Sequence, residues 1–188
     1  MGTGLRAGMA LLALFLASVV AGYYANFGYL DEALRQLQET AKETGFNPAS
    51  IALTILIKNT VVATITILSG VLVVPPILIL VNNGFFIGYT VHWAMVNKGS
   101  DPLFLASLLL PHGVLEIPVL ILATYSGLRV AGSVIDKLRH REASISARLA
   151  AELGKLKVII PLLVVSALVE ALVTPLVGML VARMLGIA

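Results

Sequence analysis

The sequence predicts an all-α membrane protein, a bundle of about five transmembrane helices that forms one integral membrane domain over residues 1–188. Hydrophobic residues make up 59% of the chain and charged residues only 12%, whereas a typical soluble domain is about 25% charged. The mean hydropathy is +0.98, and the apolar residues gather in runs long enough to cross a bilayer. This composition excludes a soluble enzyme and a soluble nucleic-acid-binding domain.

The first predicted span covers residues 7–30, where 24 consecutive residues carry no charge. As a helix this run is about 36 Å long, which is enough for a hydrocarbon core of roughly 30 Å. A cleaved signal peptide is the alternative, but its apolar region usually has only about 7–15 residues, so we predict a retained span. Residues 31–44 then carry six charged side chains in an amphipathic pattern, which predicts an acidic helix outside the membrane.

A pair of prolines divides the next apolar stretch. Residues 59–97 contain no Asp, Glu, Lys or Arg, and as one helix they would be about 58 Å long, too long for a single crossing. The pair Pro75-Pro76 interrupts that helix, because proline lacks an amide hydrogen and restricts the residue before it. We therefore predict two spans here, at residues 49–74 and 77–96.

Two further prolines, Pro111 and Pro118, interrupt the 32 mostly apolar residues that follow position 102. Because proline suits the first turn of a helix, we predict a fourth span at residues 111–134. A short re-entrant or interfacial segment at residues 103–110 would precede it. The fifth span is predicted at residues 158–185.

The distribution of charge predicts the orientation in the cell membrane. The loop at residues 136–157 contains six Lys or Arg residues against three acids, and short loops with such an excess stay in the cytoplasm. Five spans then place the N-terminus in the cytoplasm, and they place the acidic helix and the C-terminus outside it. We assign the basic loop to membrane orientation and predict no nucleic-acid partner.

Ionisable side chains inside the predicted spans mark a candidate site, because charge is costly in hydrocarbon. His112 and Glu116 are four residues apart, so a helix places both on one face, and Glu170 adds a carboxylate from the fifth span. An imidazole and two carboxylates are suitable ligands for a divalent cation, among which the imidazole favours zinc. One prediction is therefore that His112, Glu116 and Glu170 hold a metal ion inside the bundle.

Two other interpretations of the same residues are open. In one, the polar groups form a structural network in which Lys58 pairs with Glu116 or Glu170 and asparagines bond across helices. In the other, the acids relay protons or ions. The remaining members of the predicted polar cluster are Lys58, Asn59, Asn82, Asn83 and Thr174. The chain has no HExxH, GxSxG or P-loop motif, so the sequence identifies no catalytic residue and no cofactor-binding motif.

Several segments of the chain resemble the stage II sporulation protein M family of membrane proteins. Residues 110–118 (LPHGVLEIP) match its PHGxxE element, the most specific of the similarities. The pair Lys58-Asn59, residues 82–88 (NNGFFIG) and residues 170–175 (EALVTP) match further family segments in the same order. The resemblance covers residues 50–180 and implies a membrane fold. The family's namesake belongs to a bacterial complex that remodels peptidoglycan during engulfment of the forespore, where partner proteins perform the cell-wall chemistry.

The resemblance favours a non-enzymatic component that organises the membrane or envelope together with envelope-remodelling protein partners. A metal-dependent membrane hydrolase is a second class of function, in which a cation held by His112, Glu116 and Glu170 activates water. A small transporter or channel is a third, because broken spans and acids near the midplane are typical of transporters. Small residues in the spans let membrane helices associate closely, so we also predict a homodimer or larger homo-oligomer in the lipid bilayer.

Overall fold

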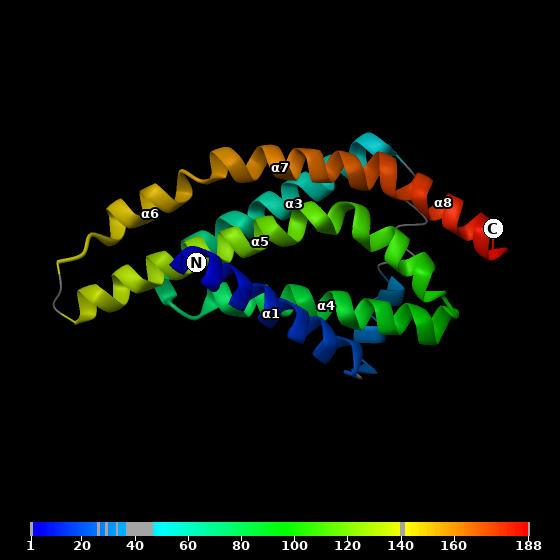
Figure 1. Cartoon of the computed structure of the whole chain (residues 1–188), viewed down its shortest axis with the longest axis horizontal. Helices are drawn as coiled ribbons and strands as arrows, with labels where there is room; N and C mark the ends of the chain where they lie inside the picture. The colour runs from blue at the N-terminus through cyan, green and yellow to red at the C-terminus, as the bar shows by residue number, and fades with distance from the viewer. Residues whose placement is uncertain are drawn as a thin grey trace.

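A computed structural model describes residues 2–25, 27–28, 30–32, 34–36, 47–139 and 142–187. The regular elements in these residues are all helical. In chain order (Figure 1) they are α1 (Thr3–Tyr23), α3 (Pro48–Leu68), the 3₁₀ helix η1 (Ser69–Leu72), α4 (Pro75–Lys98), α5 (Pro102–Leu138), α6 (Ile145–Leu153), α7 (Leu156–Leu168), the π-helix η2 (Val169–Val173) and α8 (Thr174–Leu185).

Five helical stretches are long and apolar enough to cross a membrane, which confirms the predicted membrane bundle. They are Gly4–Tyr23, Pro48–Leu72, Pro75–Lys98, Gly113–Leu138 and Ile145–Leu185. The first ends earlier than the predicted residue 30, because a lack of charge does not by itself define where a helix stops. Of the predicted acidic helix, residues 31, 32 and 34–36 are helical, and the rest lies outside the described residues.

Prolines begin three of the helices, and side-chain caps precede two of them. The Asn47 carboxamide oxygen accepts from the amides of the first turn of α3, beside Pro48. The Asp101 carboxylate does the same for α5, beside Pro102. Such caps satisfy amides that have no partner within the helix. Pro75 begins α4, as the sequence predicts.

The fourth span and the apolar segment before it form one helix. α5 continues through Pro111 and Pro118, and Pro102–Pro111 is its apolar first part. Figure 1 shows that α5 is bent rather than straight. Each proline removes one helical hydrogen bond but leaves the neighbouring ones in place. The predicted division at Pro111 is therefore not a break in the helix.

The polar segment predicted as a loop at residues 136–157 is largely helical. α5 extends into it as far as Leu138, α6 occupies Ile145–Leu153, and α7 begins at Leu156. The Ser144 hydroxyl accepts from the Ala147 amide and caps α6. The run between this cap and Gly154 is rich in Ala and Leu, which are good helix formers.

Glycines bring α1 and α4 into direct backbone contact. Gly84 and Gly88 are four residues apart on α4, the spacing that allows close approach of membrane helices. A Cβ atom added to Gly88 would lie 1.9 Å from the Val19 carbonyl oxygen, and one added to Gly22 would lie 1.9 Å from the Phe85 carbonyl oxygen. The expected packing role of the small residues is thus visible within the chain.

α5 is the central helix of the bundle. It packs against α1, α3, α4, α6, α7 and α8. Its contacts with α3 and α7 form a buried apolar core of Ala63, Ile67, Val119, Ala123, Ile159 and Leu163. A polar side chain near residue 116 therefore lies beside two other spans.

The fifth span changes its helical pattern at Val169, one residue before Glu170. The α-helical bonding of α7 gives way to the π-helix η2 before α8 begins. Pro175, in the first turn of α8, has no amide hydrogen to donate to the preceding turn. Short π-helical turns of this kind are frequent at functional sites.

Candidate functional site

Glu116 joins three of the spans. Its carboxylate, on α5, accepts a hydrogen bond from the Asn59 side-chain amide on α3. The same oxygen, Oε1, accepts from the Ser166 hydroxyl on α7 at 3.2 Å. All three groups are at least partly buried among apolar side chains. Hydrogen bonds of this kind link neighbouring helices where water is absent.

The other residues of the predicted cluster lie in different surroundings. The Lys58 side chain is exposed, and among the described residues no ion pair joins it to Glu116 or Glu170. Asn82 is exposed as well. Asn83 is half-buried, and its side-chain nitrogen donates to the Ile79 carbonyl oxygen at 2.7 Å.

Thr174 and Glu170 lie one turn apart in the fifth span. The Thr174 hydroxyl is buried and has no hydrogen-bond partner within the part of the chain that the structure describes. Glu170 is half-buried in η2. The structure therefore places Asn59 with Glu116 but does not bring the whole predicted cluster together.

The metal site remains a prediction. The backbone of His112 lies in α5, four residues before Glu116, but its side chain is outside the described residues. Among the side chains that are described, no group of three His, Cys, Asp or Glu residues is arranged to hold a metal ion.

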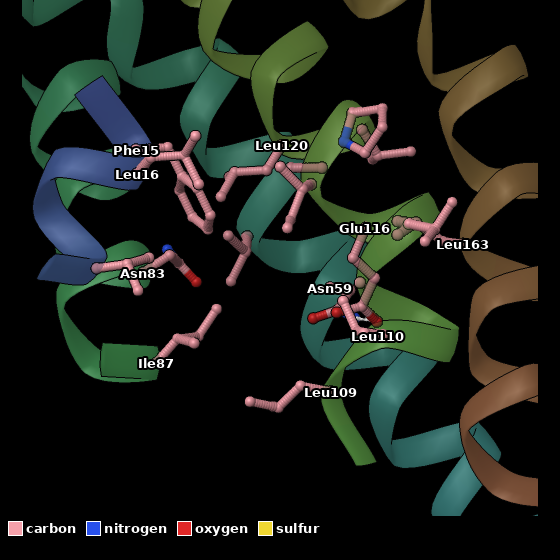
Figure 2. A pocket seen from close by; sticks show the side chains of 18 residues that line it. Phe15, Leu16, Asn59, Asn83, Ile87, Leu109, Leu110, Glu116, Leu120 and Leu163 are labelled. Carbon is pink, nitrogen blue, oxygen red and sulfur yellow. Dashed lines mark hydrogen bonds between the residues drawn. The ribbon is translucent and has the colours of Figure 1, made fainter. Parts of the chain in front are cut away.

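A cavity of about 450 Å³ lies beside Glu116, within the range of roughly 300–1,000 Å³ that is typical of ligand sites. Its walls come from α1, α3, α4, α5 and α7, and most of its surface is apolar. Asn59, Asn83 and Glu116 are its polar residues. Figure 2 shows Asn83 on one side of the cavity and the Asn59–Glu116 pair on the other.

A charged cluster, absent from the predicted site, lies where α6 meets α5 and α7. Glu152 is only 1% exposed and faces three cations. The Lys155 ammonium lies 2.6 Å from Oε2, and the Arg129 and Arg148 guanidinium groups lie 3.2 and 3.8 Å from Oε1. Lys155 also donates to the Ser126 hydroxyl at 3.1 Å. This cluster fixes the polar helix α6 against the central helix.

Sequence reasoning missed Ser166 and Glu152. Ser166 precedes Glu170 by four residues, a helical spacing, but a single serine in an apolar span carries little signal. The spacings of Arg148, Glu152 and Lys155 do indicate ion pairs on one helix face. They do not reveal that the carboxylate is buried or that Arg129 approaches it from α5.

An all-helical bundle with five apolar spans and a polar contact between them defines a polytopic integral membrane protein. The family model of the stage II sporulation protein M family matches residues 11–175. The chain belongs to this family, as the sequence resemblance predicts, and the match also includes most of the first span. Comparison with curated proteins found no match, and comparison with solved structures found none.

Proposed function

We propose that the protein is a non-enzymatic membrane component that organises other components of the envelope. The observation that supports this proposal is the engagement of Glu116, whose Oε1 accepts hydrogen bonds from α3 and α7. A carboxylate in this position holds spans together. Self-association as a homodimer or larger assembly and contact with envelope-remodelling proteins belong to the same proposal.

A metal-dependent membrane hydrolase is the second candidate. Glu116 lines the cavity, and α5 places His112 one helical turn before it. In this proposal the two residues, together with Glu170, would hold a divalent cation, with zinc favoured, and the cation would supply activation of water for a hydrolytic reaction. The two candidates differ in whether the negative charge of Glu116 is needed.

Substitutions of Glu116 distinguish these proposals. Glu116→Gln keeps an acceptor oxygen for Asn59 and Ser166 but removes the charge. We expect it to restore normal envelope morphology to cells that lack the wild-type protein. Glu116→Leu leaves both donors without that acceptor, and we expect it to lower the free energy of unfolding by about 1–3 kcal/mol. Denaturation of the purified variants in mixed micelles measures the second effect.

Glu142→Gln is the matched control, because Glu142 is exposed outside the spans. A folded Glu116→Gln variant that fails in cells would contradict the organising role. If its metal content were also lower than that of the wild-type protein, the result would favour the hydrolase.

The proposed orientation predicts which ends of the bundle react with a membrane-impermeant maleimide. The chain has no cysteine, so a single introduced cysteine supplies the one thiol that the maleimide can label. We expect Glu142→Cys, in the basic segment, to react only after the cells are permeabilised. Ile187→Cys, which is exposed near the C-terminus, should react in intact cells. The reverse pattern would show the opposite orientation.

A further inference from the structure

Exposed residues of α1 and α5 border the cavity beside Glu116. Three of its lining residues are largely exposed: Leu16 at 52%, Leu110 at 63% and Val114 at 67%. Leu16 and Val114 belong to apolar stretches long enough to cross a membrane. In a bilayer these exposed residues would face lipid chains, so a ligand would reach the cavity from the hydrocarbon at this border between α1 and α5.

The polar groups on the cavity walls present acceptor oxygens. The Asn83 side-chain nitrogen is engaged with the Ile79 carbonyl, and Figure 2 shows its oxygen turned toward the cavity. The Glu116 carboxylate lies on the opposite wall (Figure 2). A buried acceptor is stabilised by a ligand that donates a hydrogen bond. The cavity therefore suits a molecule with a long apolar chain and a donor group.

We propose that the cavity binds a single-chain amphiphile from the membrane that carries a hydroxyl group. Its chain would lie against the apolar walls contributed by α1, α5 and α7, and its hydroxyl would donate to the Asn83 oxygen. Pockets with apolar walls and a few placed polar groups bind ligands in this manner. The proposal goes beyond the organising role and depends on a different observation, the cavity.

Gly113 allows this cavity to be filled by substitution. It lines the cavity, and among the described residues an added Cβ would meet only the Ile117 Cδ1 atom, at an ordinary contact distance of 3.8 Å. Gly132 lies on the same helix outside the cavity, where an added Cβ would meet no atom within 4 Å in the part of the chain that the structure describes. Gly113→Leu and Gly132→Leu therefore form a matched pair of variants.

Photolabelling of the full chain in phosphatidylcholine vesicles tests the proposal. The probes are a long-chain alcohol with a diazirine in its chain and the matched hydrocarbon without the hydroxyl. We expect the alcohol to label peptides that contain Leu110 and Val114, and excess unlabelled hexadecanol, but not hexadecane, to suppress this labelling. Gly113→Leu should abolish it, Gly132→Leu should retain it, and Asn83→Leu should weaken alcohol binding about fivefold.

Three results would overturn the proposal. One is equal labelling by both probes with no competition by hexadecanol. Another is unchanged labelling of a folded Gly113→Leu variant. The third is a cross-link through Val114 to a second copy of the chain, which would show that a neighbouring protomer covers the border between α1 and α5. Competition by hexadecanol on the wild-type protein tests the proposed ligand site even if a variant fails to fold. Its result does not affect the test of the organising role, which uses the Glu116 variants.

Discussion

Lys155→Met is expected to lower the free energy of unfolding by about 3 kcal/mol, near the lower end of the range for a broken buried ion pair. The reason is an asymmetry in burial. Glu152 is almost fully buried, whereas the Lys155 side chain is 29% exposed. Loss of the lysine leaves a buried carboxylate oxygen without its nearest cation. Arg129 and Arg148 remain near the other oxygen, which limits the loss.

A double-mutant cycle checks this explanation. Removal of the carboxylate together with the lysine, as in Glu152→Leu with Lys155→Met, should recover part of the stability, because no buried charge is then left unpaired. Lys157→Met is the control, since Lys157 is exposed and only two residues away. Denaturant titration in mixed micelles measures the four proteins of the cycle, which are the wild type, Glu152→Leu, Lys155→Met and the double variant, together with the control. Equal losses for Lys155→Met and Lys157→Met would show that the ion pair contributes little.

The helical spans could be predicted from the sequence because they depend on local properties. Charge-free length and proline positions identified five spans, and the break before Pro75 lies where α4 begins. The continuation of α5 through Pro111 could not be predicted in the same way. Whether a proline ends a helix or only bends it depends on the packing around the chain, here on the many helices that contact α5.

The contacts of the candidate site could be predicted from the sequence to a smaller extent than the spans. Lys58 and Asn59 are adjacent, and adjacent residues point about 100° apart around a helix. Only one of them therefore faces α5, and it is the uncharged Asn59 that contacts Glu116. The burial of Glu152 likewise depends on where α6 packs after the chain turns, which is a tertiary property. Residue types indicated where polar contacts occur, but their partners required the fold.

The glycine spacing in α4 is a local sequence pattern that takes part in a tertiary contact. Gly84 and Gly88 are visible in the sequence as a small-xxx-small pattern, which predicts a close helix contact but not its partner. In the structure the partner is α1 of the same chain. The pattern is therefore used within the protomer, and the proposed self-association would use other surfaces of the bundle.

Gly88→Ala is expected to destabilise the protein by about 3 kcal/mol, at the upper end of the range for overpacking. The added Cβ would lie 1.9 Å from the Val19 carbonyl oxygen and 2.8 Å from the Tyr23 amide nitrogen. Both atoms belong to the backbone, so no side-chain rotation relieves the clash, and α1 has to move away from α4. Denaturant titration of the reconstituted protein measures the loss.

Gly132→Ala and Gly22→Ala complete this test. Gly132 has open space around its Cβ position, so alanine there should leave the stability unchanged or slightly increased, since alanine is the better helix former. Gly22→Ala would clash with the Phe85 backbone across the same interface and should cost about as much as Gly88→Ala. Once one alanine has separated the helices, the second alanine causes a smaller steric clash. The double variant should therefore lose less free energy of unfolding than the sum of the two single losses. Strictly additive losses, or a Gly88→Ala variant as stable as Gly132→Ala, would show that α1 and α4 are not in direct backbone contact.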